Sequence, residues 1–233
     1  MGITADGVYI VTGGAGAVAG PVARVFHAAG ARLALVGRED ALLRQRAEPL
    51  GALAIAADLT SPEAAERAVG ETERVFGRVD GLIHTAGGFE MAPAGESDPA
   101  LYDRLFDTNM RTLFCAVHAV LPRLLGQRDG FIAGFSAGVV RTGGGAGMTI
   151  YAAAKAAVSA YLRALESEVR SSGVRVAVVY PLSAIDTPRN RLDMPGADPR
   201  GWVDPEEIAH ALLFAATRGP RGALVELAVG VRR

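Results

Sequence analysis

The stretch that decides the fold lies near the amino terminus and reads Val8-Tyr9-Ile10-Val11-Thr12-Gly13-Gly14-Ala15-Gly16-Ala17-Val18-Ala19-Gly20. An apolar run of strand length leads into a glycine-rich turn, and a segment with helical periodicity follows it. Gly14, Gly16 and Ala19 match the spacing Gly-x-Gly-x-x-Gly/Ala, in which glycines let the backbone approach a pyrophosphate. The helix amino terminus beyond the turn offers free N–H groups to an anion. The stretch therefore predicts a dinucleotide-binding turn.

The remainder of the chain alternates short apolar runs with longer segments of helical periodicity. Strands are predicted at Val8–Val11, Arg32–Val36, Ala52–Ala57, Gly81–His84, Phe131–Phe135, Arg175–Val179 and Ala223–Val229. Helices are predicted at Val18–Ala29, Asp40–Glu48, Pro62–Phe76, Pro99–Leu125, Tyr151–Ser171 and Pro205–Thr217. Continuous apolar strands are typical of a parallel sheet that helices cover on both faces. The pattern predicts an α/β fold, in which residues 1–233 form a single-domain, Rossmann-type, doubly wound parallel sheet of about seven strands.

Two segments of the chain show no regular periodicity, Gly138–Thr149 and Ser183–Trp202. Each follows the carboxyl end of a predicted strand, which is the edge where open α/β sheets bind ligands. Long irregular segments in a compact domain are usually functional. We expect both to border the substrate site, and the second to act as a mobile lid.

Composition restricts the classes of partner. The 233 residues include 24 basic and 25 acidic side chains, so no basic surface for nucleic acid or an anionic membrane is expected. Cys115 is the single cysteine, which rules out an intramolecular disulfide and favours a reducing, cytoplasmic location. No signal peptide or membrane span is apparent. The four histidines are scattered, and no metal site is expected.

The end of the second predicted strand bears on the choice of cofactor. An NAD site usually has an acidic residue there, which accepts a hydrogen bond from the ribose 2′-hydroxyl. This chain has Gly37 followed by Arg38, so no carboxylate repels a 2′-phosphate and a guanidinium is available to bind one. We expect NADP as the cofactor, with NAD as the alternative.

Tyr151-Ala152-Ala153-Ala154-Lys155 opens a predicted helix and places a phenol and an ammonium on the same helix face. A free phenol titrates near 10, which is too high for acid–base work at neutral pH. A neighbouring ammonium favours the phenolate, so Lys155 is expected to lower the pKa of Tyr151.

With the glycine turn and this Tyr/Lys pair, the chain resembles the short-chain dehydrogenase/reductase family over essentially its whole length. The resemblance implies that Tyr151 is the general acid/base and that Lys155 holds the ribose hydroxyls. It also implies a proton-relay and structural role for Asn109. The cofactor contacts that the turn and the resemblance together imply are Gly13, Gly14, Gly16, Ala17, Val18, Arg38, Asp58, Leu59, Ala86, Gly87, Tyr151, Lys155, Pro181 and Thr187. The partner is then a small-molecule substrate.

Three departures from the family pattern affect the site. Ala17 and Ala19 stand where glycine is usual, and their methyl groups are expected to crowd the pyrophosphate. His84-Thr85 replaces a pair of asparagines, and His84 is interpreted as a packing residue. Strand counting puts Ala137 at the position of the family's substrate-orienting serine. Its neighbour Ser136 either takes over that catalytic role or leaves it vacant.

Local similarity to dihydropteridine reductase, in residues 186–198 and 86–89, leaves the substrate open. Three alternatives remain: hydride transfer between a nicotinamide and a carbonyl/hydroxyl pair, reduction of a C=N bond in a pterin-like ring, or a catalytically silent cofactor-binding sensor or scaffold. Phe89, Met148, Met194 and Trp202 are expected to line the cleft and favour an apolar, flat substrate. The helices Pro99–Leu125 and Tyr151–Ser171 carry many small and apolar residues, and the resemblance implies that they pair in a homodimer or homotetramer.

Overall fold

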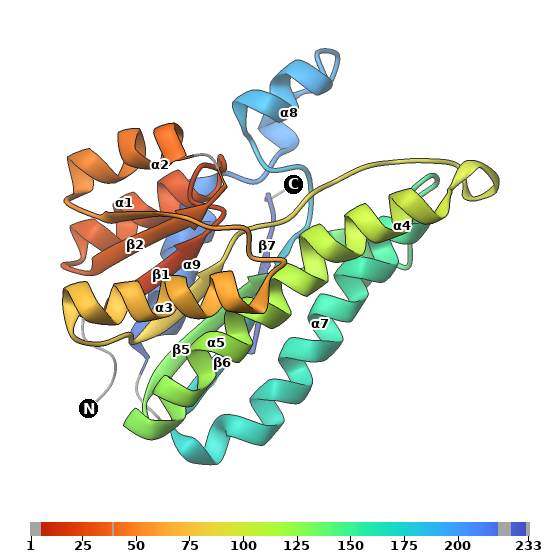
Figure 1. Cartoon of the computed structure of the whole chain (residues 1–233). Coiled ribbons are helices and arrows are strands. Elements are labelled where there is room, and N and C mark those ends of the chain that lie inside the picture. The colour runs from red at the N-terminus through yellow and green to blue at the C-terminus, as the bar shows by residue number, and fades with distance from the viewer. Residues whose placement is uncertain (1–5, 39, 219–224, 232–233) are drawn as a thin grey trace.

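A single parallel sheet with helices on both faces makes up the protein (Figure 1). The computed structural model describes residues 6–38, 40–218 and 225–231. The sheet has seven strands in the order β3-β2-β1-β4-β5-β6-β7, and every neighbouring pair runs parallel. The predicted α/β fold class, a doubly wound parallel sheet of about seven strands, is confirmed.

The strands are β1 Val8–Thr12, β2 Arg32–Gly37, β3 Leu53–Ala56, β4 Gly81–His84, β5 Gly130–Phe135, β6 Val174–Pro181 and β7 Glu226–Val229. The helices are α1 Ala19–Ala28, α2 Asp40–Ala47, α3 Pro62–Phe76, α4 Pro99–Phe106, α5 Thr112–Gln127, α6 Gly138–Thr142, α7 Thr149–Val169, α8 Pro188–Asp193 and α9 Pro205–Thr217. A π-helical segment, Asp107–Arg111, joins α4 to α5. Short 3-10 turns lie at Glu48–Leu50, Ala94–Glu96, Arg170–Ser172 and Pro199–Gly201.

Side chains that alternate along each strand fill two cores, one on each face of the sheet. In β1, Ile10 packs into the core beneath α3, α5 and α7. Its neighbours Tyr9 and Val11 pack on the opposite face, against α1, α2 and α9. Because both faces are buried at β1, β4 and β5, these central strands have a buried residue at every position and read as continuous apolar runs.

The structure differs from the sequence-based expectation in several elements. The helix predicted at Pro99–Leu125 is continuous but contains the π-helical segment and ends at Gln127. The two segments predicted to be irregular contain α6 and α8. Thr187 caps α8 by accepting a hydrogen bond from the N–H of Asn190, and Pro188 occupies the first helical turn. The strand predicted at Ala223–Val229 lies partly outside the described residues, and its described part is β7.

No helix in the described part of the chain is long and apolar enough to cross a membrane.

Candidate active site

A cavity of about 460 Å³ lies at the carboxyl edge of the sheet. The order of the strands reverses between β1 and β4, and a crevice at such a switch point is where open α/β sheets bind ligands. The residues that line the cavity are Val18, Thr85, Gly87, Gly88, Phe89, Phe135, Ser136, Ala137, Gly138, Val139, Met148, Tyr151, Lys155, Pro181, Leu182, Ser183, Ala184, Ile185, Asn190 and Met194. Tyr151, Lys155 and Ser136 of the predicted catalytic set therefore meet at one cavity.

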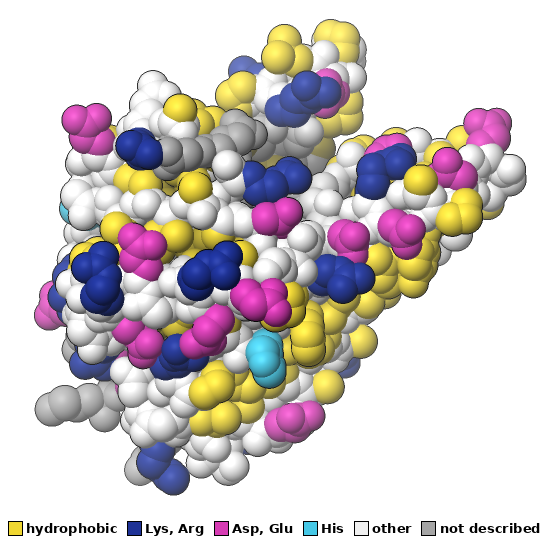
Figure 2. Space-filling view, in the orientation of Figure 1, with side chains coloured by type: hydrophobic (Ala, Val, Ile, Leu, Met, Phe, Trp, Pro, Cys, Tyr) yellow, Lys and Arg dark blue, Asp and Glu magenta, His cyan; other side chains and the backbone are white. Residues whose placement is uncertain are grey.

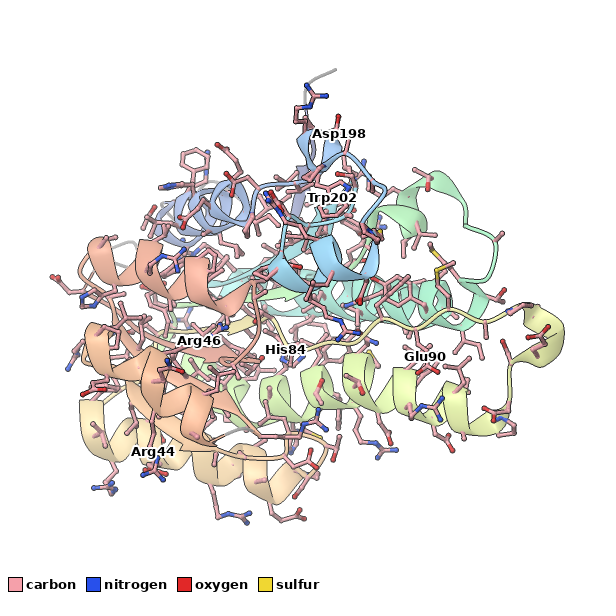
Figure 3. The ribbon with its side chains drawn as sticks, turned by 90° about the horizontal axis from the view of Figure 1, so that it is seen from above. Arg44, Arg46, His84, Glu90, Asp198 and Trp202 are labelled. Atoms are coloured by element: carbon pink, nitrogen blue, oxygen red, sulfur yellow. The ribbon has the colours of Figure 1, made fainter. Side chains whose placement is uncertain are left out.

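The glycine turn after β1 is closed by close backbone approaches. Gly13 has a φ of +64°, and a Cβ built on it would lie 2.8 Å from the backbone N and Cα of Ala86. The N–H of Gly16 donates to the carbonyl of Gly13 at 2.6 Å. From α2, the Arg46 guanidinium donates to the carbonyl of Gly16 (Figure 3). A side chain at Gly13 would collide with the backbone of Ala86, and a turn with such close backbone approaches suits the pyrophosphate of a dinucleotide.

Helix α1 begins directly after the turn. Its N-cap residue Val18 makes no side-chain capping hydrogen bond, so the first N–H groups of the helix are available to an anion. Ala19 is fully buried in the core below, so its methyl group packs inward. The expectation that Ala19 crowds a pyrophosphate is therefore wrong. Ala17 is half-buried at the turn itself.

The residues predicted for the adenosine end of the cofactor lie at the ends of β2 and β3. Arg38 is exposed immediately after β2, and Asp58 is exposed after β3. Hydrogen bonds from the backbone and hydroxyl of Thr60 lower the pKa of Asp58, and the charge of Arg38 contributes. Leu59 is different, because its side chain is buried in the core under α3 and α5.

Asn109 joins the π-helical segment to the loop after β4. Its Oδ1 accepts from the N–H of Gly88 at 3.2 Å, and its Nδ2 donates to the carbonyl of Gly88 at 3.0 Å and to that of Leu105 at 2.9 Å. A Cβ at Gly87 would lie 2.9 Å from Asn109 Oδ1 and 3.2 Å from Lys155 Nζ. Glycine at this position lets the two side chains approach the same backbone.

The imidazole of His84 is buried and links Thr12 at the end of β1 to Thr112 at the start of α5 (Figure 3). Thr112 Oγ1 lies 3.2 Å from His84 Nε2 and donates its own proton to the carbonyl of Thr108, so it accepts from Nε2–H. On the other side, Thr12 Oγ1 lies 2.9 Å from Nδ1 and therefore donates to it. Thr12 Oγ1 in turn accepts from the N–H of Ala86. Burial and the charge of Lys155 lower the pKa of His84 to about 3, so the imidazole is neutral.

Tyr151 and Lys155 lie one turn apart on α7. Lys155 Nζ is 6.0 Å from the centre of the Tyr151 ring and donates to the carbonyl of Phe135 at 2.9 Å. Burial raises the pKa of Tyr151 to about 12 and lowers the pKa of Lys155 to about 8. The expectation that Lys155 lowers the pKa of Tyr151 is wrong for this structure, because desolvation is the effect that acts on the phenol.

Ser136 and Ala137 follow β5 and both line the cavity. The hydroxyl of Ser136 is buried and donates to the backbone carbonyl of Lys155 at 2.9 Å, so its proton is directed to α7. The methyl group of Ala137 forms the adjoining part of the wall and offers no donor.

The loop after β6 contributes the far wall of the cavity. Pro181 lines it, whereas the buried Thr187 caps α8 and lies outside the lining. Of the four residues expected in the cleft, Phe89, Met148 and Met194 line it. The expectation for Trp202 is wrong: its side chain lines a separate cavity with Asp186, Arg191 and Arg200, close to Asp198 (Figure 3).

Sequence reasoning did not single out Val139, Leu182, Ile185 or Asn190, although all but Leu182 lie in the two segments expected to border the site. The available signal was their position in the segments that follow β5 and β6, at the carboxyl edge of the sheet. Among the described residues, no group of three or more His, Cys, Asp or Glu side chains could hold a metal ion.

Comparison with known proteins identifies the class to which this fold and site belong. The family model described as short chain dehydrogenase matches residues 7–194. The chain therefore belongs to the short-chain dehydrogenase family of oxidoreductases, whose members generally use nicotinamide cofactors.

Individual relatives extend the match over nearly the whole chain. An uncharacterised oxidoreductase of Staphylococcus saprophyticus is 30% identical over 222 residues, which cover 90% of this chain and 91% of the relative. Another, from Staphylococcus aureus, is 29% identical and covers 94% of both chains. The crystal structure of gox2181 superposes with a TM-score of 0.86 at 24% identity and covers 97% of this chain and 95% of its own, a likeness of fold.

Proposed function

We propose that the protein is an NADP(H)-dependent reductase or dehydrogenase that interconverts a carbonyl compound and its alcohol. The observation that carries this proposal is the convergence of Tyr151 and Lys155 on one cavity, beside a glycine turn shaped for a pyrophosphate. Gly87 permits the close approach of Asn109 and Lys155 at the same place. The domain that carries this chemistry is the whole chain.

The chain's own residues supply the acid and the electrostatic stabilisation. When bound, the reduced nicotinamide supplies a hydride to the carbonyl carbon. The pKa of about 12 keeps the Tyr151 phenol protonated at neutral pH, so it can donate a hydrogen bond and then its proton to the carbonyl oxygen. Lys155 carries its charge below a pH of about 8 and stabilises negative charge that develops on that oxygen.

Residues around the glycine turn hold the cofactor in this proposal. Gly13, Gly14, Gly16, Ala17 and Val18 contact the pyrophosphate side, and Asp58 with the backbone of Leu59 borders the adenine. Ala86, Gly87 and Pro181 border the nicotinamide. Thr187 Oγ1 accepts from Asn190 N–H at 3.1 Å, which leaves its hydroxyl proton available to the cofactor.

The preference for NADP over NAD rests on the end of β2. Gly37 has no carboxylate to repel a 2′-phosphate, and the exposed Arg38 guanidinium is available to form a bidentate pair with one. The charge of Arg38 also acts on the Asp58 carboxylate, at the same end of the proposed cofactor site.

We also propose that the protein is a homodimer or homotetramer of the cytoplasm. Hydrophobic side chains gather along the side of the molecule formed by α4, α5 and α7 (Figure 2). On α5, Phe114 is 46% exposed, stacks on His118 and contacts the edge of Tyr161 on α7. A monomer would leave these aromatic rings in water.

The test combines a cofactor titration with turnover measurements. NADPH and NADH are titrated by fluorescence, and each is then offered with a panel of aldehydes, ketones and a quinonoid pterin. Tyr151→Phe should abolish carbonyl reduction while cofactor affinity is retained. Reduction of the pterin alone would assign the C=N reaction instead. Tight cofactor binding without turnover of any substrate would identify a cofactor-binding sensor.

A further inference from the structure

The wall of the cavity beyond Tyr151 and Lys155 is apolar. Val139 lies in α6, Met148 precedes α7, Leu182 follows β6, and Met194 follows α8. Within the described residues that line the cavity, Lys155 is the single side chain with a charge at neutral pH. A substrate carboxylate or phosphate on this wall would lose its hydration without gaining a counter-ion.

The side-chain polar groups of the wall are mostly engaged with the backbone. The hydroxyl of Ser136 donates to Lys155 O, the hydroxyl of Thr85 donates to Thr12 O at 2.7 Å, and the amide of Asn190 donates to Ile185 O at 2.8 Å. The phenol of Tyr151 and the remaining ammonium protons of Lys155 serve the reacting oxygen. The cavity thus satisfies one polar group at the reaction centre and offers apolar surface to the rest of the substrate.

Phe89 provides a flat apolar surface next to the reacting phenol. Its ring centre lies 4.8 Å from that of Tyr151 at an interplanar angle of 88°, and the residue is 58% exposed. A large aromatic side chain exposed beside a cavity gains free energy when a second ring covers it.

The segment that carries Phe89 is held in place on both sides. The side-chain amide of Asn109 accepts from the N–H of Gly88 and donates to its carbonyl. Glu90 forms an ion pair with Arg104 of α4 at 2.9 Å (Figure 3). Ala92 N–H donates to the carbonyl of Gly147, next to Met148. The ring is therefore preorganised for binding and loses little freedom when a substrate packs against it.

We propose that the substrate is an uncharged carbonyl compound whose C=O is conjugated to a flat ring, and that Phe89 selects for that ring. This inference rests on the proposed carbonyl reductase function and adds the substrate class to it. The volume of about 460 Å³ must hold the nicotinamide as well as the substrate, which favours a compact ring system over a long chain.

The test uses three aldehydes of similar size with the purified protein and NADPH: 4-methylbenzaldehyde, its charged counterpart 4-formylbenzoate, and the non-planar cyclohexanecarbaldehyde. We expect kcat/KM for 4-methylbenzaldehyde to exceed that for 4-formylbenzoate by about tenfold or more. In Phe89→Leu, the ratio of kcat/KM for 4-methylbenzaldehyde to kcat/KM for cyclohexanecarbaldehyde should fall by about three- to tenfold, mainly through a higher KM for the planar aldehyde. Met148→Arg should raise the relative rate with 4-formylbenzoate, because it gives the wall a cation.

Met91→Leu is the matched control, because Met91 is 50% exposed on the same segment but lies outside the cavity lining. It should leave all three rates unchanged, and cofactor titrations should show that every variant is folded. Equal rates for the neutral and charged aryl aldehydes, or no effect of Phe89→Leu on the planar preference, would overturn the inference and leave the proposed function standing. Failure to reduce any aldehyde despite cofactor binding would instead refute the proposed function.

Discussion

Replacing Ser136 with alanine distinguishes two roles for its hydroxyl. It either makes a structural hydrogen bond to α7 or donates a hydrogen bond to the reacting oxygen of the substrate. The hydroxyl is buried and donates to the carbonyl of Lys155 at 2.9 Å. That carbonyl lies inside α7, where it also accepts the N–H of Ser159 in the regular helical pattern, so the substitution leaves no backbone acceptor unpaired. The loss is then one neutral hydrogen bond, about 0.5–1.5 kcal/mol of folding free energy. For a chain of this size this corresponds to a fall in Tm of about 2–4 °C per kcal/mol.

Catalysis should respond very differently under the two roles. A hydroxyl that donates to the developing oxyanion is worth about 10²–10³ in kcat. Because the Ser136 proton is directed to α7, we expect kcat/KM of Ser136→Ala to stay within about threefold of wild type, well below that range. Adding a hydroxyl to the cavity wall with Ala137→Ser should leave carbonyl reduction unchanged or make it faster.

The assay pairs steady-state kinetics on one aldehyde with thermal unfolding. Ser159→Ala is a matched control, since Ser159, like Ser136, is a buried serine. It lies on α7, and its hydroxyl bonds to Tyr180, away from the cavity. Both rates should be preserved, and Ser159→Ala should lower Tm more than Ser136→Ala, because it leaves the buried Tyr180 hydroxyl without its partner. A hundredfold lower kcat in Ser136→Ala alone, at normal cofactor affinity, would refute the reasoning and make Ser136 the oxyanion donor.

Three further predictions concern the cofactor, the pH profile and the loop after β6. Arg38→Ala should weaken NADPH binding about ten- to a hundredfold, from the loss of about 1.5–3 kcal/mol in charged hydrogen bonds, and leave NADH nearly unchanged; equal effects on both cofactors would contradict the assignment. Because burial lowers the pKa of Lys155 to about 8, its charge is present below that pH, so kcat/KM for reduction should be flat near pH 7 and fall as pH rises through about 8. A profile with no inflection between pH 7 and 9 would remove Lys155 from the electrostatics. Hydrogen exchange in residues 183–202 should slow when a substrate analogue binds, as for a closing lid; slow exchange already present in the free protein would show that the segment is rigid.

The sheet was predictable because its signal is local. The central strands are buried on both faces, so their apolar runs are visible in sequence, and the glycine turn after β1 marks the edge where the candidate site lies. Helix α8 also had a signal in the sequence, since Thr187 caps the helix and Pro188 occupies its first turn. The helix has six residues, which are too few to show a helical hydrophobic period.

Features that depend on contacts between distant residues could not be read in this way. The bonds of Asn109 at the π-helical segment run to Gly88, 21 positions earlier. The orientation of the Ser136 hydroxyl depends on Lys155, and the position of Trp202 depends on how the chain packs around Arg191 and Arg200. The pKa of Tyr151 is shifted opposite to the expected direction because burial, which spacing does not reveal, is the effect that acts on the phenol.

The neutral imidazole of His84 links the stability of the folded protein to pH at the carboxyl edge of the sheet. Its imidazole accepts from Thr12 on one side and donates to Thr112 on the other, so an added proton would face the Thr12 hydroxyl and the Lys155 ammonium. The folded protein resists that proton down to a pH of about 3, whereas an unfolded histidine accepts it near its ordinary pKa of 6.5. Between pH 6.5 and about 3, His84 therefore takes up a proton when the chain unfolds, and the stability that it contributes is lost progressively as pH falls below 6.5. Acid should therefore lower the stability of the folded chain through a group that lies at the ends of β1 and β4, beside the glycine turn.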